Sequence, residues 1–300
     1  MSNTIYVREI PEYVLDGLRL GRHVEHDDRS RDYAFTVPRK LAVQPLQPVQ
    51  HQRYIPILDQ GEIGSCTGNA GEGAAGTAPA FAAIPAGCAA RPDPGNGAGD
   101  ESQALSLYSH ATELDNIPGT YPPTDTGSTG IAAAKAMMQA GLISGYQHTF
   151  TLSDALAALQ IVPLMFGINW YTSFDMPDAN GLVTITPGAT VRGGHEVLAT
   201  ELVADRQLIG FDNSWSMSWG LQGRFYMSFA DADRLLGEQG DVIVPVPLSQ
   251  PVPVPVQPAQ PQKPAQPGQP APGSALTPVE ELERQMWSMF KSWAKLRGFE

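Results

Sequence analysis

The feature that most constrains this 300-residue chain is a set of short runs that must meet in space if they act together. In the first run a Gln stands six residues before a Cys. A Gly-His pair and an Asn-Ser-Trp run with a second Trp follow far downstream. Together these runs supply a nucleophile, a base, an orienting amide and an oxyanion donor for acyl transfer to a thiol. The residues are Gln60, Cys66, Gly194, His195, Asn213, Trp215 and Trp219.

Each residue type suits its chemical role. A thiolate is the competent nucleophile, so Cys66 needs a cationic neighbour or a helix N-terminus to lower its pKa. Gly64 and Ser65 predict a turn and N-cap with a helix after Cys66, and an imidazolium at His195 would pair with the sulfur. The Asn213 carbonyl can fix the imidazole tautomer without adding charge. Gln60 can donate its amide N–H to a tetrahedral oxyanion beside the Cys66 backbone N–H.

The runs and their order resemble those of the papain-like cysteine peptidases. The resemblance implies an α+β fold of two lobes, one helical and one an antiparallel β-sheet or barrel, with the substrate groove between them. It implies that Cys66 is the nucleophile, His195 the general base, Asn213 the orienting amide and Gln60 the oxyanion donor.

The resemblance also implies supporting residues around that centre. Trp215 is expected to shield the bond between the Asn and His side chains from water, with Trp219 packed against it. The run from Asp125 to Ser128 is similar to the family's Gly-bearing segment, whose backbone pairs with an extended substrate. The residues expected to contact substrate are Gly127, Ser128, Gly194 and Trp215.

Three positions depart from the family pattern. Thr67 follows the nucleophile where an aromatic residue is usual, and Ile63 replaces a common disulfide cysteine. Glu196 follows the base where a small residue is usual. Because neighbours on a strand point to opposite faces, Glu196 is expected to face away from His195. If it lines the substrate groove instead, we expect a preference for a basic side chain near the cut.

The chain divides into four segments by composition. Residues 1–50 are expected to form an N-terminal arm, with a small pro-segment as the alternative, and residues 51–245 to form the papain-like domain. A Pro-rich linker in polyproline II conformation is predicted over residues 246–276, because Pro recurs at every third position. An amphipathic helix is predicted over residues 277–300, where Thr277 suits the N-cap.

Local patterns within the papain-like domain predict its elements. Residues 78–99 are rich in Ala, Gly and Pro, which favours a flexible surface insertion. Helical periodicity covers residues 103–114 and 131–140, and Gly141 predicts a helix end. Strands at 197–203 and 207–211 predict a hairpin that would place His195 and Asn213 at the same end. A further strand is expected at 224–229.

The aromatic face of the C-terminal helix suggests a protein partner or self-association, which would tether the enzyme. Folding back onto the catalytic domain is one alternative, within reach of such a linker. Binding to a membrane surface is another, disfavoured by the few basic residues.

Composition excludes several function classes. A net charge of −12 and a pI near 4.9 argue against a nucleic-acid partner. Cys66 and Cys88 are the only cysteines, so a disulfide would consume the nucleophile; this favours a reducing compartment. No closely spaced Cys or His pair suggests a metal site, and no cofactor is expected. No signal peptide or transmembrane segment is apparent. We expect a cytoplasmic protein. The resemblance extends to bacterial and phage-encoded members of the family and so implies a virion-associated protein as the alternative, if the chain is phage-encoded.

Two classes of function follow. The first is a cysteine peptidase that hydrolyses peptide or isopeptide bonds through an acyl-thioester. The second is a non-catalytic scaffold or binding protein with a papain-like fold, such as a phage virion component. The complete set of catalytic residues favours the peptidase, while Thr67 and the Gly-rich helix after Cys66 keep the scaffold open.

Overall fold

The computed structural model describes residues 4–15 and 17–248. The amphipathic helix predicted over residues 277–300 lies outside the described residues, as does the predicted Pro-rich linker except for residues 246–248. No helix within the described ranges is long and apolar enough to cross a membrane.

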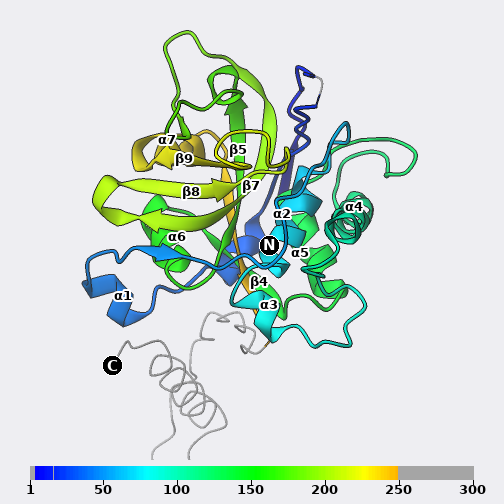
Figure 1. Ribbon diagram of the computed structural model, residues 1–300, viewed down its shortest axis with the longest axis horizontal. Helices are drawn as coiled ribbons and strands as arrows, with labels where there is room; N and C mark the ends of the chain where they lie inside the picture. Colours follow the sequence, from blue (N-terminus) through cyan, green and yellow to red (C-terminus); the bar gives the residue numbers. More distant parts are fainter. Residues whose placement is uncertain (1–3, 16, 249–300) are drawn as a thin grey trace, which may run out of the picture. The chain divides into compact units, whose positions relative to one another are not determined.

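A mostly antiparallel sheet forms the centre of the described fold (Figure 1). Its strand order is β4-β10-β5-β7-β8-β9-β6, β3 pairs with β7, and the β6–β9 pair is parallel. The strands are β3 (Val49–Gln50), β4 (Gly145–Thr149), β5 (Leu164–Tyr171), β6 (Leu182–Val183), β7 (Val191–Val203), β8 (Leu208–Asp212), β9 (Arg224–Ser228) and β10 (Asp241–Val246).

Strands β5 and β7 are buried on both faces because helices cover both sides of the sheet. Met165 pairs with Leu198, and both side chains pack among the helices of one face. Phe166 pairs with Val197, and these two belong to the core on the opposite face. The period of two along each strand therefore distributes apolar side chains to two cores.

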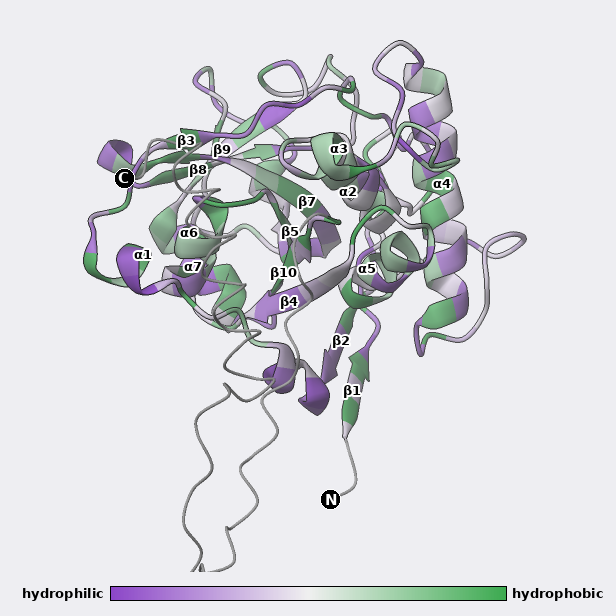
Figure 2. Ribbon diagram, turned by 90° about the horizontal axis from the view of Figure 1, so that it is seen from below, coloured by the Kyte–Doolittle hydropathy of each residue, from purple (hydrophilic) through white to green (hydrophobic). Residues whose placement is uncertain are grey.

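Helices lie on both sides of this sheet, as Figures 1 and 2 show from two directions. Helices α2, α4 and α5 cover one face, and α6 and α7 cover the other. In Figure 2, α4 shows alternating hydrophilic and hydrophobic residues, as expected for a helix with one buried face. The helices are α1 (Arg39–Val43), α2 (Cys66–Ala75), α3 (Ala80–Ala83), α4 (Gly97–Leu114), α5 (Gly130–Gln139), α6 (Leu152–Leu159) and α7 (Phe229–Gly237), with 3-10 turns η1 (Asp28–Tyr33), η2 (Thr172–Phe174) and η3 (Ala204–Arg206).

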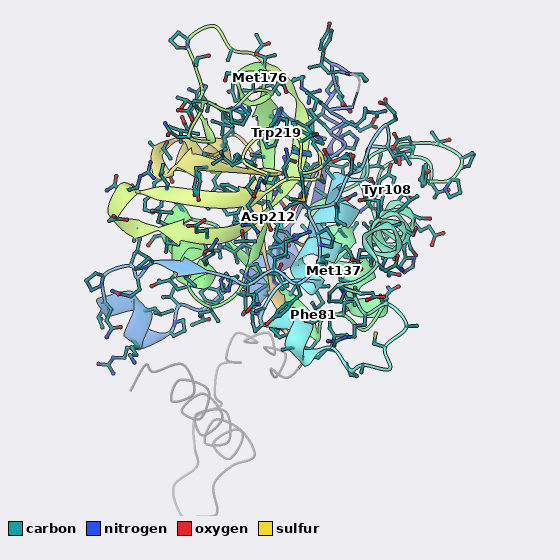
Figure 3. All side chains as sticks on the ribbon, in the orientation of Figure 1. Phe81, Tyr108, Met137, Met176, Asp212 and Trp219 are labelled. Atoms are coloured by element: carbon teal, nitrogen blue, oxygen red, sulfur yellow. The ribbon has the colours of Figure 1, made fainter. Side chains whose placement is uncertain are left out.

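Helix α2 is buried along its whole length and packs against α4. Gly68 permits this contact, since a Cβ there would lie 2.2 Å from the backbone oxygen of Ala104 and 2.7 Å from the amide of Tyr108. Met137 of α5 is fully buried in the same helical core. Figure 3 shows Tyr108 and Met137 on the helical side of the molecule and Asp212 and Trp219 on the sheet side.

Several predicted boundaries are confirmed and two predictions are corrected. Helix α5 ends near Gly141, whose φ of +73° suits a glycine after a helix. The hairpin predicted after β7 is present, with η3 as its turn and β8 as its second strand. Residues 78–99 are not a plain insertion, because they include α3 and the first residues of α4. Helix α4 begins earlier than periodicity suggested, because Asn96 caps Gly99 through its side chain at 3.1 Å.

The N-terminal residues form an antiparallel pair, β1 (Ile5–Arg8) and β2 (Val24–Asp27). The chain between these strands is only partly exposed: Ile10 and Leu20 are buried, whereas Tyr13 is 69% exposed. Farther along, residues 49 and 50 already belong to the main sheet through β3. The predicted arm therefore contains a two-stranded sheet and a connecting segment that is anchored by buried residues near its two ends.

Candidate active site

Cys66 lies on α2 and His195 on β7, and these two elements pack against each other. Cys66 is the first residue of α2, so its side chain lies at the positive end of that helix. His195 lies on β7, and Asn213 follows directly after β8. The backbone N–H of Glu196 donates to the Cys66 sulfur at 3.4 Å, which places the thiol against the strand residue next to His195.

The imidazole of His195 is held by the side chain of Asn213. Nε2 lies 2.7 Å from the Asn213 carbonyl oxygen, so Nε2 carries the proton in this bond. The other ring nitrogen, Nδ1, is buried and has no hydrogen-bond partner among the described residues. The tautomer fixed by Asn213 therefore leaves Nδ1 as an acceptor for a proton.

Three tryptophans enclose this bond. The ring of Trp215 stacks on the imidazole with centroids 4.9 Å apart and planes 22° apart. Trp170 of β5 meets the imidazole edge-on, also at 4.9 Å, and Trp219 meets Trp215 edge-on at 5.1 Å. His195 has no exposed surface. Trp215 and Trp219 lie where the resemblance implied; Trp170 was missed, because a Trp in a buried strand has no distinct signal in the sequence.

Burial holds the thiol and the imidazole in their neutral forms. It lowers the pKa of His195 to about 3, against a smaller opposing effect of the Asn213 hydrogen bond. It also raises the pKa of the Cys66 thiol, although the Glu196 N–H acts in the opposite direction. A charged thiolate and imidazolium pair therefore requires that water reach the site.

Gln60 makes contacts that the sequence did not predict. Its side-chain N–H group donates to the backbone oxygen of Leu20 at 3.1 Å and to that of Ile63 at 2.8 Å. Its carbonyl oxygen accepts from the hydroxyl of Ser214 at 2.6 Å. The amide proposed for an oxyanion thus binds a carbonyl of the chain's own N-terminal region.

That N-terminal region crosses the candidate groove. We call residues 10–15 and 17–23 the covering segment. The amides of Gly21 and Arg22 donate to the Gly194 oxygen at 3.1 and 3.0 Å. Ser128 donates to the Gly21 oxygen and accepts from the His23 amide, both at 2.8 Å. The indole N–H of Trp215 donates to the Arg19 oxygen at 2.7 Å.

The residues expected to contact substrate therefore contact the covering segment. Ser128, Gly194 and Trp215 bind its backbone directly. Gly127 lies against it, because a Cβ on Gly127 would sit 2.4 Å from the Gly21 oxygen. Pairing with Ser128 is parallel, as an isolated bridge between Arg22 and Ser128. The sequence did not predict these contacts with the chain's own N-terminal region.

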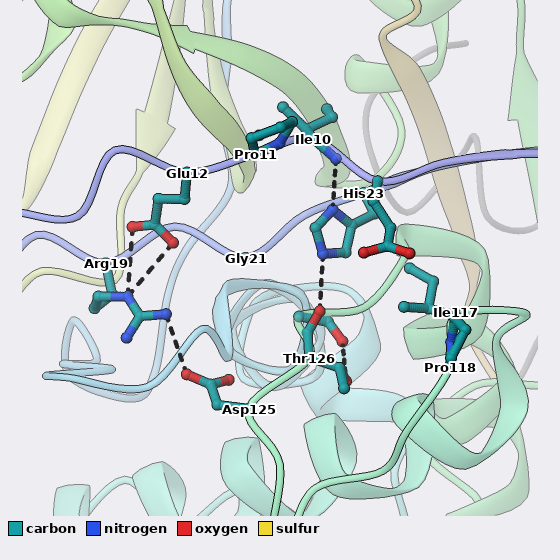
Figure 4. Close-up of a pocket in the computed structure, with 13 residues that line it drawn as sticks. Ile10, Pro11, Glu12, Arg19, Gly21, His23, Ile117, Pro118, Asp125 and Thr126 are labelled. Atoms are coloured by element: carbon teal, nitrogen blue, oxygen red, sulfur yellow. Dashed lines mark hydrogen bonds and ion pairs between the residues drawn. The ribbon is translucent and has the colours of Figure 1, made fainter.

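A pocket of about 410 Å³ lies between the covering segment and the loop that carries Gly127 (Figure 4). On its wall the Nδ1 atom of His23 accepts from the Ile10 amide at 2.9 Å, and Nε2 lies 2.8 Å from the Thr126 oxygen. Arg19 forms ion pairs with Glu12 and Asp125 across the same pocket. These contacts hold the segment to the helical side of the fold.

A second arginine, Arg192 of β7, anchors the covering segment from the sheet side. It is buried and donates to the backbone oxygens of Tyr13 and Leu18 at 3.0 and 2.7 Å. It also pairs with Asp175 at 2.9 Å and lies over the Trp215 ring. No sequence motif marks Arg192, because its partners are mostly backbone atoms distant in the chain.

The remaining sequence predictions concern cysteines and metals. Both Cys66 and Cys88 are free thiols, and Cys88 is only partly buried. Within residues 4–15 and 17–248, no group of three His, Cys, Asp or Glu side chains is placed to hold a metal ion.

Comparison with solved structures identifies the architecture. The fold is similar to that of xylellain, a cysteine protease from Xylella fastidiosa, with a TM-score of 0.57 and 18% identity over 77% of this chain and 96% of xylellain. Lower TM-scores relate it to procathepsin L 3 of Tenebrio molitor (0.49; 13% identity; 72% and 74% covered) and to bromelain of Ananas comosus (0.38; 13%; 66% and 99%). No protein-family model and no curated protein sequence matches the chain. The match to xylellain confirms the predicted papain-like α+β fold.

Proposed function

We propose that this chain, which has the fold of the papain-like cysteine peptidases, hydrolyses peptide or isopeptide bonds through Cys66. The observation that carries the proposal is the 2.7 Å bond between His195 and Asn213. This bond leaves Nδ1 of His195 without a partner among the described residues. The backbone amide of the next residue, Glu196, contacts the Cys66 sulfur. Such a set of groups suits acyl transfer to a thiol.

The reaction would proceed in two halves. Cys66 loses its proton to His195 Nδ1, and the sulfur forms a bond to the substrate carbonyl carbon. The carbonyl oxygen becomes an oxyanion that the Cys66 backbone N–H and the Gln60 amide can stabilise. The C–N bond then breaks as His195 protonates the departing amine, which leaves a thioester. Water, deprotonated by His195, attacks the thioester, releases the carboxylic acid product and restores the thiol.

The covering segment must leave before this reaction. In the closed state it uses the Gln60 amide, the Gly194 oxygen and the Ser128 backbone, all of which a substrate needs. Burial also keeps the thiol and the imidazole neutral. We therefore infer that the closed form is inactive and that displacement of residues 10–15 and 17–23 admits substrate.

A papain-like scaffold without catalysis is the second candidate. The observation that favours it is the same closed site, since Cys66 has no exposed surface. Under this alternative the covering segment would remain in place permanently. We also propose that residues 277–300 bind a protein partner or a second copy of the chain, which suits either function.

The test uses the full chain with Gly21→Ala, which forces the covering segment away from Gly64. We expect cleavage of a quenched-fluorescent peptide library by this variant, with new product termini seen by mass spectrometry. Addition of Cys66→Ala should abolish that cleavage. Absence of cleavage in the Gly21→Ala chain, or cleavage that persists without Cys66, would favour the scaffold.

A further inference from the structure

Two carboxylates flank a glycine on three neighbouring strands. The register pairs Glu196 of β7 with Gly167 of β5, and Gly167 with Asp241 of β10. Residues directly opposite one another in antiparallel strands point to the same face. Glu196 and Asp241 therefore project from the same face of the sheet at the same level, with no side chain between them.

The missing side chain creates a socket. A Cβ on Gly167 would lie 2.6 Å from an Asp241 oxygen, 2.9 Å from a Glu196 oxygen and 2.7 Å from Nε of Arg22. Gly130 of α5 closes the socket, since a Cβ there would lie 2.8 Å from the other Glu196 oxygen. We call Gly130, Gly167, Glu196 and Asp241 the acidic socket. Any side chain larger than Gly at position 130 or 167 would fill it.

In the closed state the guanidinium of Arg22 occupies the acidic socket. Its side chain has no exposed surface, forms an ion pair with Asp241 and donates to the Gln239 oxygen at 2.9 Å. The fit is incomplete: Nε and Nη1 of Arg22 and both Glu196 carboxylate oxygens have no hydrogen-bond partner among the described residues. A fully buried acid with unused acceptors, beside a second, partly buried acid, favours a cation there.

The protonation of Glu196 agrees with such a socket. Burial, and next the charge of Asp241, raises the pKa of the Glu196 carboxyl, while Arg22 lowers it. Without a cation, the two acids would disfavour each other's charged forms. A guanidinium or ammonium group in the socket relieves that repulsion.

The acidic socket adjoins the candidate catalytic centre. Glu196 follows His195 in the chain, and its amide contacts the Cys66 sulfur. The side chain of Arg22 reaches the socket while its backbone amide donates to the Gly194 oxygen. An extended peptide held by the same backbone groups would present a side chain to the same opening.

We propose that the acidic socket selects an arginine or lysine side chain of the substrate, next to the bond that is cut, once Arg22 has left. The proposal rests on the proposed peptidase function and names its substrate class. Arginine should be preferred to lysine, because a planar guanidinium can donate to both carboxylates at once.

The test compares arginine with citrulline, a neutral residue of nearly the same shape. The full chain carries Arg22→Gln, which empties the socket of its own cation. The reagents are peptidyl acyloxymethyl ketones, which alkylate the active thiol. They carry arginine or citrulline at either of the two positions before the ketone, and mass spectrometry measures the rate of alkylation of Cys66. Arg8→Gln, a change at an exposed arginine of β1, serves as the matched control.

We expect the arginine reagent to react roughly ten- to a hundredfold faster than its citrulline counterpart in the Arg22→Gln chain, as for hydrogen bonds to charged groups. Adding Glu196→Gln and Asp241→Asn should bring the ratio to about one. A ratio near one in the Arg22→Gln chain itself would overturn the proposal.

Binding without chemistry separates this proposal from the peptidase function. In a Cys66→Ala/Arg22→Gln chain, tryptophan fluorescence measures the affinity for an arginine tripeptide and its citrulline analogue. Preferential binding of arginine with no alkylation in any chain would retain the socket and refute the peptidase. Alkylation of Cys66, together with equal affinities for the two tripeptides, would support a reactive thiol and refute the socket.

A second variant guards against misfolding of Arg22→Gln. Arg22→Lys keeps a cation in the socket, and its chain is treated with iodoacetamide in the presence of each tripeptide. The arginine peptide should displace the covering segment and accelerate alkylation of Cys66 more than the citrulline peptide does. Equal acceleration by the two peptides would count against the socket.

Discussion

The side-chain amide of Gln60 donates a hydrogen bond of 3.1 Å to the backbone carbonyl of Leu20. A group suited to an oxyanion therefore holds the chain's own N-terminal region in place. Substitution of Gln60 should therefore make Cys66 more accessible in the closed protein and slow peptide cleavage in the open protein.

Gly21→Ala should open the site. Gly21 has a φ of +130°, and a Cβ there would lie 2.1 Å from the Gly64 oxygen, so the covering segment must shift. We expect alkylation of Cys66 by iodoacetamide to become at least about tenfold faster, equivalent to about 1.4 kcal/mol. Gly17→Ala is the control, because Gly17 also has positive φ but its Cβ would contact nothing within 4 Å. Equal rates in the two variants would show that the segment does not limit access.

Gln60→Ala should act in two directions. In the Gly21→Ala background we expect kcat for peptide cleavage to fall on the order of 100-fold, because one oxyanion donor is lost. In the otherwise unchanged chain we expect faster alkylation of Cys66, since the bond to Leu20 is lost as well. Gln52→Ala, at an exposed glutamine, should change neither rate. A fall in both rates would indicate general damage to the fold instead.

The sequence alone predicted part of the candidate site but not the contacts of the covering segment. The runs around Cys66, His195 and Asn213 predicted a helix that begins near Cys66 and a hairpin that brings His195 close to Asn213, because local patterns fix helix starts and hairpin geometry. Arg22, Arg192 and Trp170 could not be found, because their roles depend on contacts between residues far apart in the chain. Helix α4 began earlier than predicted because a side-chain cap at Asn96 outweighed weak periodicity.

The acidic socket illustrates the same limit at one residue. Strand alternation correctly indicated that Glu196 and His195 point to different faces, but it did not identify the neighbours of Glu196. The pairing of Glu196, Gly167 and Asp241 depends on the register of three strands. A single sequence does not fix that register.

Acid should loosen the covering segment through His23. Burial lowers the pKa of His23, and its Nδ1 accepts from the Ile10 amide, a bond that protonation would break. A lowered pKa in the closed state means that His23 supports closure fully above about pH 6.5, its ordinary pKa. That support is lost as pH falls below it.

Hydrogen–deuterium exchange at the amides of Gly21, Arg22 and His23 provides the measurement. After correction for the intrinsic pH dependence, their protection should fall between about pH 7 and 5. His23→Gln retains a donor and an acceptor without titrating, so it should flatten this dependence. His26 is another half-buried histidine whose pKa is also lowered, and His26→Gln should leave the pH dependence unchanged. A pH dependence that persists in His23→Gln would exclude His23 as its origin.

Removal of residues 277–300 should separate assembly from catalysis. We expect unchanged peptide cleavage in the Gly21→Ala background, since no predicted site residue lies in this range. The mass in solution, measured by light scattering, should decrease if the segment binds a second copy. An unchanged mass, together with unchanged capture of a protein partner, would refute the proposed tether.

The most direct test of the central claim is mass-mapped labelling of the Gly21→Ala chain with a thiol-directed peptidyl epoxide. We predict modification at Cys66, with Cys88 unmodified, and loss of that modification when His195→Ala is added. Labelling that is equal at Cys66 and Cys88, absent altogether, or unaffected by His195→Ala would contradict it.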